Sequence, residues 1–254
     1  MTASLPAGWP AGYDRLVLPE TDSTMAEARR RVATLAAPTW ILAQAQSAAQ
    51  GRRGRAWLMP TGNFAATLVM RPALGPGLAA LRSFTASLAL FDAFVAVTGR
   101  AEPFALKWPN DVLLNGGKVA GILLESAGQG GDVSYLSIGI GVNLAAAPEP
   151  EQVEAGAFRP VSLVSETGIA VSPEDFLAAL APAYARYEER LCREGFAPIR
   201  EAWLVRAARL GEVVIARTGT GESVGIFETI DPCGNIVLRT DSGQRTIPAA
   251  EIFF

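Results

Sequence analysis

The sequence predicts an α+β protein in which a larger domain of mixed secondary structure, residues 1–209, precedes a small all-β domain, residues 210–254. Two observations support this organisation. Segments with apolar residues at helical spacing alternate with strand-like runs in the larger part, whereas short strands separated by glycine-containing turns fill the chain beyond Gly211. Because about 45 residues are marginal for an independent domain, we expect a small barrel that docks onto the larger domain.

The first part of the chain alternates between expected strands and helices. Thr24 and Glu27 have the spacing of a capping box, and the apolar residues that follow recur at helical spacing. The most apolar stretch, 84–97, contains polar residues such as Thr85 and is shorter than a membrane span, which indicates a core helix. The expected elements are strands at 13–18, 40–44 and 64–70, helices at 23–36 and 78–98, and a loop at 48–56.

The second part begins as a meander of strands and ends in the all-β domain. Asn115-Gly116-Gly117 is a hairpin signal, Ser172 and the acidic residues after it favour a helix start, and Pro182 is expected to kink or split that helix. The expected elements are strands at 104–108, 112–114, 119–125 and 133–144, helices at 172–193 and 199–208, and strands at 212–217, 222–230, 235–240 and 245–248.

The composition excludes several classes of function. Histidine is absent from all 254 residues, so a Ser-His-Asp triad, a Cys-His pair and a histidine general base are excluded. The two cysteines form no disulfide framework, which indicates a reducing, cytoplasmic setting. A net charge of −3 argues against a general binder of nucleic acid or membrane surfaces, and the N-terminus lacks the pattern of a signal peptide.

Lysine is rare in this chain and is confined to one short segment. Only two of the 22 basic residues are lysines, Lys107 and Lys118, as expected where a compact, rotatable ammonium is needed. A rigid turn between them projects Asn110, which can donate and accept hydrogen bonds, and Asp111, which can bind a magnesium ion or a sugar hydroxyl. Taken singly, these residues are better explained as turn formers and, for Lys118, as a charge on an edge strand.

A second group of charges lies in the loop before the third expected strand. Arg52, Arg53 and Arg55 fall within four residues beside two glycines. Glycine lets a backbone approach an anion closely, and arginine matches pairs of phosphate oxygens. From composition alone, phosphate binding and a solvated basic loop are about equally favoured. The chain contains no P-loop, and Gly139-Ile-Gly141 lacks the rest of a dinucleotide fingerprint.

Three motifs together resemble one enzyme family. The chain contains GRRGRAW, then KWPNDVLLNGGKVAGILLES, then IGIGVNL, and the resemblance to the biotin protein ligases (biotin–[acetyl-CoA-carboxylase] ligases) spans nearly the whole sequence. It implies a catalytic domain like that of class II aminoacyl-tRNA synthetases, with a mixed sheet backed by helices, followed by an SH3-like β-barrel. It also implies that the enzyme uses MgATP to convert biotin to biotinyl-5′-AMP and pyrophosphate. The biotinyl group then passes to one lysine of a biotin carboxyl carrier protein, from acetyl-CoA carboxylase or a related carboxylase.

The resemblance assigns the motif residues to two ligands. Lys118 and Arg52 would be catalytic, because they would meet the biotin carboxylate and the α-phosphate. The residues that would bind biotin are Ser23, Thr24, Met25, Gln46, Gln50, Gly51, Arg52, Lys118 and Gly121. The residues that would bind ATP are Arg52, Arg55, Trp57, Lys107, Asn110, Asp111, Lys118 and Asn143, with Asp111 also a magnesium ligand.

The arginine loop departs from the family pattern, and two alternatives stay open. Ala49 and Gln50 stand where the family commonly has glycine and arginine, which predicts a weaker hold on the adenylate. The alternatives are a lipoate-type protein ligase and a non-catalytic sensor of biotin or nucleotide. The Ser23-Thr24 motif comes too early for a preceding DNA-binding domain, so we expect no nucleic-acid partner and no membrane partner. Assembly as a homodimer is left open.

Overall fold

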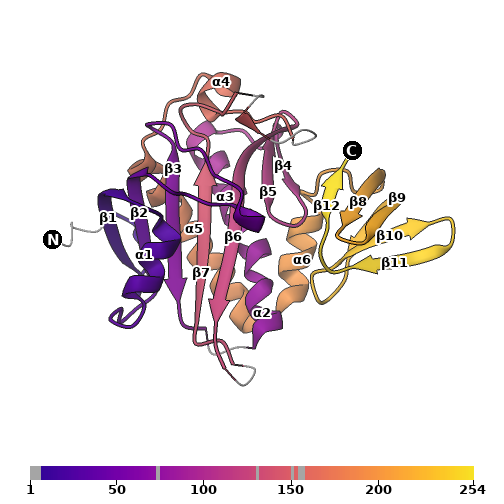
Figure 1. Cartoon of the computed structure of the whole chain (residues 1–254), viewed down its shortest axis with the longest axis horizontal. Helices are drawn as coiled ribbons and strands as arrows, with labels where there is room; N and C mark the ends of the chain where they lie inside the picture. Colours follow the sequence, from indigo (N-terminus) through magenta and orange to yellow (C-terminus); the bar gives the residue numbers. More distant parts are fainter. Residues whose placement is uncertain (1–6, 73–74, 130–131, 150–151, 154–157) are drawn as a thin grey trace.

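The computed structural model describes residues 7–72, 75–129, 132–149, 152–153 and 158–254, and its strands form two separate sheets (Figure 1). The larger sheet has seven strands in the order β1-β2-β3-β7-β6-β5-β4. Only the β1–β2 ladder is parallel, so the sheet is mixed, as predicted. Its strands are β1 (Asp14–Thr21), β2 (Thr39–Gln46), β3 (Phe64–Met70), β4 (Phe104–Lys107), β5 (Asp111–Leu114), β6 (Gly117–Ala127) and β7 (Tyr135–Val142).

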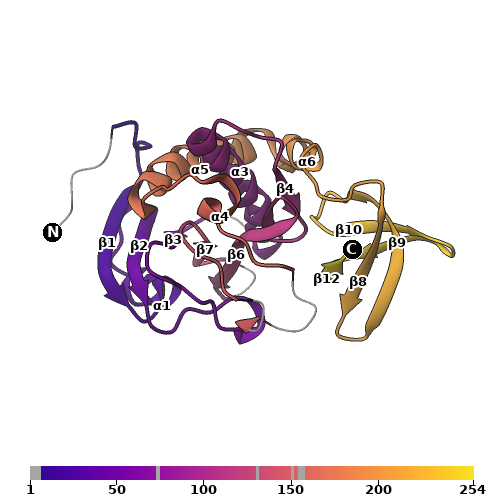
Figure 2. The same cartoon turned by 90° about the horizontal axis from the view of Figure 1, so that it is seen from above.

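Helices cover the two faces of this sheet unequally. The helices are α1 (Thr24–Arg31), α2 (Pro76–Ala80), α3 (Arg82–Thr98), α4 (Leu163–Thr167), α5 (Pro173–Glu194) and α6 (Phe196–Leu204), with a short 3-10 turn at Arg52–Gly54. Figures 1 and 2 show α3, α5 and α6 behind the sheet and α1 on the opposite face. The main core therefore lies between the sheet and α3 with α5, and the α1 face remains available for a ligand.

The apolar helix α3 is a core helix, as its sequence predicted. By length and composition, the segment Gly77–Thr98 could cross a membrane, but 67% of its most apolar window is buried inside the protein. Its buried Ser87 is satisfied there, because the hydroxyl donates to the Phe84 carbonyl and accepts from the Trp203 indole N–H, whereas the buried Thr85 hydroxyl has no hydrogen-bond partner among the described residues. A helix with this burial packs between other elements instead of facing solvent on all sides.

Helix α1 begins and ends differently from the prediction. The N-cap is Ser23, whose hydroxyl accepts from the Met25 N–H, so the expected capping box on Thr24 is wrong. Glu27 pairs with Arg30 and Arg31 and does not reach back to the cap. The helix ends at Arg31 and not at residue 36, because the Arg71 side chain binds the carbonyls of Val32 and Leu35 and so satisfies the end of the helix.

The last two helices also correct the expected boundaries. Ser172 caps α5 as predicted, but the helix continues without a break through Pro182 to Glu194. Helix α6 lies at 196–204 and not at 199–208. Its expected last turn is instead a non-helical turn with one bridge from Ala207 to Leu106 of β4, formed by hydrogen bonds of the Arg206 and Ala208 backbones with Leu106. The single helix expected at 78–98 is divided at Leu81 into α2 and α3, and the sequence analysis missed α4.

The C-terminal part is an antiparallel five-stranded sheet in the order β11-β10-β9-β8-β12. Its strands are β8 (Val213–Thr218), β9 (Gly221–Ile230), β10 (Ile236–Thr240), β11 (Gly243–Ile247) and β12 (Glu251–Phe253), of which β12 was not predicted. Among the described strands no ladder joins β11 to β12, so the sheet is open but compatible with the expected SH3-like class. The division between residues 209 and 210 stays a prediction.

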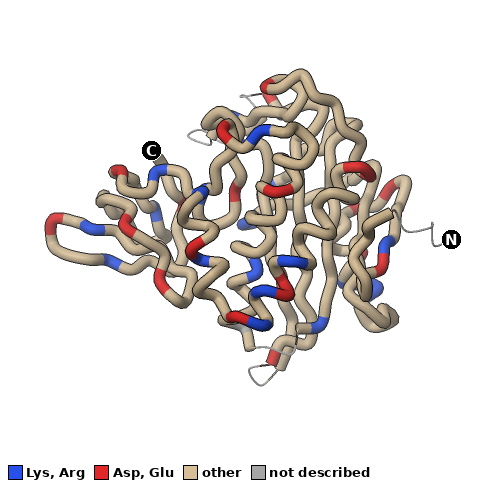
Figure 3. The backbone as a smooth tube through the Cα atoms, turned by 180° about the vertical axis from the view of Figure 1, so that it is seen from behind, with Lys and Arg blue, Asp and Glu red and all other residues tan. Residues whose placement is uncertain are grey.

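Charges on the helical side of the molecule are mixed in sign. Figure 3 shows acidic and basic residues interspersed along the chain on this side. Exposed ion pairs account for part of this pattern, among them Arg186 with Asp92 and Arg190 with Glu194. Such exposed pairs contribute little to stability, and they leave the surface without a field of one sign.

Candidate functional site

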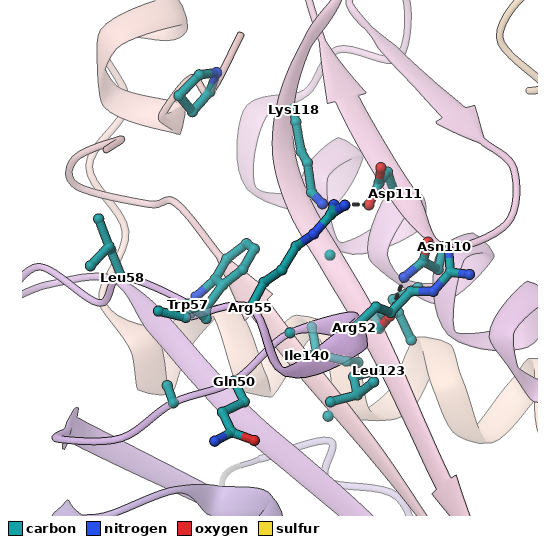
Figure 4. Close-up of a pocket in the computed structure, with 18 of the residues that line it drawn as sticks. Gln50, Arg52, Arg55, Trp57, Leu58, Asn110, Asp111, Lys118, Leu123 and Ile140 are labelled. Carbon is teal, nitrogen blue, oxygen red and sulfur yellow. Dashed lines mark hydrogen bonds and ion pairs between the residues drawn. The ribbon is translucent and has the colours of Figure 1, made fainter. Parts of the chain in front are cut away.

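A pocket of about 360 Å³ lies on the α1 face of the larger sheet, beside the C-terminal sheet. It gathers every residue that the sequence analysis assigned to a ligand, although they span more than a hundred positions of the chain. Those residues are Ser23, Thr24, Met25, Gln46, Gln50, Gly51, Arg52, Arg55, Trp57, Lys107, Asn110, Asp111, Lys118, Gly121 and Asn143. Figure 4 shows the cationic end of this pocket. That these residues share a pocket does not assign a role to each, so their roles stay predictions.

The floor of the pocket consists of glycines on two neighbouring strands. Gly121 of β6 pairs directly with Gly141 of β7. A Cβ on Gly141 would lie 2.4 Å from the Trp57 ring, and a Cβ on Gly139 would lie 2.8 Å from the Met25 sulfur. The missing side chains therefore let Trp57 and Met25 approach the backbone. The alternation Gly-x-Gly within a strand was the sequence signal for this floor, because it places both glycines on one face.

A β-bulge turns Lys118 toward the pocket. In the β5–β6 ladder Val112 pairs with Ala120, but Leu113 pairs with Lys118, so one extra residue, Val119, is accommodated in β6. Val119 and Ala120 are consecutive yet both are in the core. Without the bulge, Lys118 would share the core face with Ala120. The bulge therefore places the Lys118 ammonium on the pocket side, with Gly121.

Two ammonium groups converge on one buried carboxylate at the end of the pocket. Lys118 Nζ lies 2.7 Å from Asp111 Oδ1, and Lys107 Nζ lies 3.4 Å from Asp111 Oδ2. Burial favours the protonated carboxyl, but the two ammoniums outweigh it and hold the pKa of Asp111 below its ordinary value. Burial lowers the pKa of Lys107, whose ammonium also lies 4.5 Å from the Phe158 ring centroid. Lys118 is the more accessible ammonium, with 31% of its side chain exposed.

Asn110 links the sheet to the arginine loop. Its side-chain N–H donates to the Ile122 carbonyl at 2.5 Å, and its side-chain oxygen accepts from Arg52 Nη1 at 3.2 Å (Figure 4). Burial lowers the pKa of the Arg52 guanidinium, which the charge of Asp111 opposes. Arg52 is thus a partly desolvated cation on the same side of the pocket as Lys118, where it can meet an anion.

The other two loop arginines bind the C-terminal sheet through a residue that the sequence analysis missed. Glu251 of β12 accepts from Arg55 Nη1 at 2.8 Å and from Arg53 Nη1 at 3.3 Å. The hydrogen bond from Arg55 is the main cause that lowers the pKa of Glu251. No sequence pattern could have found this contact, because β12 itself was not predicted and the partners are 196 and 198 positions apart.

The opposite end of the pocket is built around the start of α1. The Thr24 N–H donates to Gln46 Oε1 at 2.7 Å, and the Thr67 hydroxyl donates to the Thr24 hydroxyl at 2.9 Å. Ser23, Thr24 and Gln46 thus form a small polar cluster that suits a neutral ligand head group with donors and acceptors. Gln50 lies on the loop and points away from Lys118 and Asp111 (Figure 4).

Besides Asp111 Oδ1, which forms an ion pair with Lys118, two polar atoms in the pocket wall are buried without a hydrogen-bond partner among the described residues. These are the Trp57 indole N–H and the side-chain oxygen of Asn143. The Asn143 amide N–H is already used, because it donates to the Val161 carbonyl at 3.1 Å. Unpaired buried polar atoms are uncommon, so both atoms are candidates for contact with a ligand.

The donors near Asp111 do not fit a directly bound magnesium ion. Both carboxylate oxygens already face lysine ammonium groups, which repel a second cation. In the described part of the chain, no group of three or more His, Cys, Asp or Glu side chains could hold a metal. The predicted role of Asp111 as a metal ligand is therefore disfavoured. Magnesium usually reaches such sites through substrate phosphates, which makes it part of the nucleotide substrate.

Fold and site together define a class of enzyme. The described wall of the pocket contains neither histidine nor cysteine, but it has a polar cluster at one end and several cations at the other. Such a site suits reactions that need charge neutralisation between two anions, as in nucleotide-dependent activation of an acid. The site is therefore that of a nucleotide-dependent ligase.

Family comparisons agree with this class. A model of the biotin/lipoate A/B protein ligase family matches residues 17–143, and a model of the biotin protein ligase C-terminal domain matches residues 210–254. The chain belongs to the biotin/lipoate A/B protein ligase family, and within it to the biotin protein ligases.

Individual relatives support the same placement. The biotin–[acetyl-CoA-carboxylase] ligase of Paracoccus denitrificans is 59% identical over 238 residues, 94% of this chain and 99% of that protein. The bifunctional ligase/repressor of Escherichia coli is 30% identical over 226 residues, 89% of this chain and 69% of that protein. The expected enzyme class, an ATP-dependent biotin ligase, is confirmed by this similarity.

Solved structures confirm the predicted fold. A biotin protein ligase from Aquifex aeolicus, in complex with biotin and ATP, superposes with a TM-score of 0.78 at 24% identity, over 94% of this chain and 97% of that one. A biotin protein ligase from Leishmania major, in complex with biotinyl-5-AMP, has a TM-score of 0.64 at 26% identity, over 94% of this chain and all of that one.

Proposed function

We propose that the pocket holds biotin and MgATP end to end and that the residues around it perform both steps of protein biotinylation. The polar cluster of Ser23, Thr24 and Gln46 binds the biotin head group, and the cationic end binds the carboxylate and the phosphates. One observation carries this assignment. The Lys118 ammonium is turned by a bulge into the same pocket as the Arg52 guanidinium, so two cations from different elements meet where two anions must react.

In the first step the biotin carboxylate oxygen attacks the α-phosphorus of ATP. A bond forms between this oxygen and the α-phosphorus. The bond between the α-phosphorus and the oxygen that bridges it to the β-phosphorus breaks, and pyrophosphate leaves. The carboxylate is already ionised near neutral pH, so no general base is required. Lys118 and Arg52 reduce the repulsion between the carboxylate and the phosphate, and they stabilise the charge that develops on the phosphoryl oxygens.

Other residues of the pocket hold the two ligands in place. Gly121 and Met25 line the apolar part of the biotin site. Gly51 and Gln50 lie on the loop that covers biotin. Arg55 and Lys107 add positive charge near the phosphates. Trp57, Asn110, Asp111 and Asn143 contact the nucleotide, which would satisfy the buried side-chain oxygen of Asn143 and the indole N–H of Trp57.

In the second step a lysine amine attacks the acyl carbon of biotinyl-5′-AMP. An amide bond forms, the bond to the phosphate oxygen breaks, and AMP leaves. The relatives named as biotin–[acetyl-CoA-carboxylase] ligases support an acceptor of one kind, the biotin carboxyl carrier protein of that carboxylase or of a related one. We place the reaction in the cytoplasm, with no nucleic-acid partner, and assembly as a homodimer stays a prediction.

Exchange of labelled pyrophosphate into ATP tests the first step. We expect exchange that requires biotin and magnesium and that is absent when lipoate replaces biotin. Mass spectrometry of a carrier domain incubated with the enzyme tests the second step, with a variant carrier whose acceptor lysine is arginine as control. Exchange with lipoate instead of biotin would contradict the assignment of biotin as the substrate. Binding of biotin without exchange would indicate a non-catalytic sensor.

A further inference from the structure

The turn that carries Asn110 and Asp111 is held from outside by two hydrogen bonds that neither ligand assignment uses. The buried Trp108 indole N–H donates to the Gly234 carbonyl at 3.0 Å, which lies in the β9–β10 turn of the C-terminal sheet. The Ser83 hydroxyl, at the start of α3, donates to the Pro109 carbonyl at 3.0 Å. Two consecutive residues are therefore fixed by two elements that contribute no side chain to the described pocket wall.

The turn that supplies the Gly234 carbonyl has a defined conformation. Asp231 Oδ1 accepts from the backbone N–H groups of Cys233 and Asn235 at 2.8 and 2.9 Å. Gly234 has a φ of +86°, and a Cβ there would lie 3.0 Å from the side chains of Leu81 and Phe84. Glycine therefore meets both requirements at this position, the left-handed backbone and the close seat against the start of α3.

A second turn of the same sheet provides a contrast. Gly243, the first residue of β11 after the β10–β11 turn, also has a positive φ, +115°, but a Cβ there would have no neighbour within 4 Å. The two turns make similar demands on their backbones. Only the β9–β10 turn of the pair is packed against the catalytic sheet, so local strain and contact with the active-site turn can be separated by experiment.

We propose that Gly234 and Ser83 are positioning residues for the nucleotide half of the active site, acting through Trp108 and Pro109. This proposal rests on the proposed function. The Asp111 carboxylate lies between two ammonium groups at 2.7 and 3.4 Å, and Asn110 spans from Ile122 to Arg52. Small displacements of the turn change these distances directly, because Asp111 begins β5 immediately after it.

The biotin end of the pocket is held independently of this turn. Thr24 is fixed by Gln46 of β2 and Thr67 of β3, at the other side of the sheet from β4 and β5. Loss of the outside hydrogen bonds therefore affects binding of the nucleotide more than binding of biotin, whose carboxylate meets Lys118 and Arg52 but whose head group is held at Thr24. A purely structural role would instead lower the amount of folded enzyme and affect both substrates alike.

The test compares Trp108→Phe, Ser83→Ala and Gly234→Ala with the control Gly243→Ala. In biotin-dependent pyrophosphate exchange we expect the first three to raise KM for ATP about three- to tenfold, the effect of losing one hydrogen bond. KM for biotin, and the Kd of biotin measured by calorimetry without nucleotide, change less than KM for ATP, because the biotin head group is held at Thr24. Gly243→Ala leaves both KM values unchanged even where its thermal midpoint falls.

Three results would overturn the proposal. One is an unchanged KM for ATP in folded Trp108→Phe and Ser83→Ala. Another is an equal rise of both KM values, and the third is a Gly243→Ala variant as impaired toward ATP as Gly234→Ala. Ser83→Ala removes only a hydroxyl, so it keeps the test decisive where the tryptophan variant does not fold. Absence of biotin-dependent exchange in the wild-type enzyme would instead refute the proposed function.

Discussion

The active site has two groups of cations, and they are held in different ways. Lys107 and Lys118 project from strands of the seven-stranded sheet onto Asp111, and Lys107 and Asp111 are buried. Arg53 and Arg55 lie on a loop and reach Glu251 of the other sheet, with 54% and 38% of their side chains exposed. Charges held inside a sheet are screened little by water and salt, whereas exposed loop charges are screened strongly. We therefore expect the strand-held group to contribute more to the chemistry than the loop-held group.

Replacement of Lys118 by alanine is expected to have the largest effect. The change removes the ammonium that the bulge presents to the pocket, and biotin-dependent pyrophosphate exchange should fall by at least about a thousandfold, as for loss of a main electrostatic group. Circular dichroism should report an intact fold, because the side chain is partly exposed. Exchange near the wild-type rate would show that the strand-held cations are not the dominant group.

Replacement of Asp111 by asparagine tests the buried carboxylate and its pH dependence. The variant leaves the Lys107 ammonium buried without its partner, which should cost about 3 kcal/mol of unfolding free energy at pH 7. The folded-state pKa of Asp111 is below its ordinary value, so the unfolded state binds more protons as the pH falls. The carboxylate's contribution is therefore fully present above the unfolded pKa and is lost as the pH falls through the folded pKa.

Urea unfolding of wild type and of the Asp111 variant between pH 7 and pH 2 measures this contribution. The difference between their unfolding free energies should be constant near neutral pH and should shrink below about pH 4. A difference that grows as the solution becomes more acidic would mean that the carboxylate is protonated in the folded enzyme.

Replacement of Gly141 by alanine is expected to have a smaller effect, about tenfold on kcat/KM in pyrophosphate exchange, which corresponds to about 1.4 kcal/mol. The new Cβ would lie 2.4 Å from the Trp57 ring and would push the ring away from the pocket floor. Gly219→Ala is the matched control, because a Cβ there has no neighbour within 4 Å. Equal activity of the Gly141 and Gly219 variants would mean that the close packing of Trp57 on Gly141 is not needed for activity.

Replacement of Glu251 by glutamine addresses the loop-held group and should have the smallest effect. Partly exposed ion pairs contribute about 1 kcal/mol or less, so trypsin should cleave after the loop arginines about three- to fivefold faster in the variant. The difference should vanish in 1 M salt. Glu222→Gln is the control, because Glu222 pairs with Arg217, outside the loop, at 2.6 Å. Equal cleavage of the wild-type enzyme and the Glu251 variant would mean that this contact does not hold the loop.

Much of the fold and most of the site could be predicted from local sequence patterns. The strands from 104 to 142 follow from alternating apolar residues and the Asn115-Gly116 turn, and the site follows from motifs that resemble those of a known family. Features that depend on distant contacts were not predicted. Helix α1 ends early because Arg71 binds its last carbonyls, and residues 206–208 leave the helix to pair with β4.

Two parts of the site were beyond sequence reasoning for a similar reason. The bulge at Val119 depends on how β6 pairs with β5 and β7, and a single strand's pattern gives no sign of it. Glu251 belongs to a three-residue strand whose only described ladder is with β8. Short edge strands carry too few residues for a periodic pattern, so their position follows from packing alone.

The extra residue at Val119 makes the length of this hairpin part of the enzyme's chemistry. If β5 and β6 paired regularly with every residue kept, Lys118 would share the core face with Ala120 and its ammonium group would enter hydrocarbon, while every other motif remained intact. Substitutions at Val119 that keep an apolar side chain would be harmless by comparison. In this segment, activity therefore depends on the register of the β5–β6 ladder as well as on the side chains that it carries.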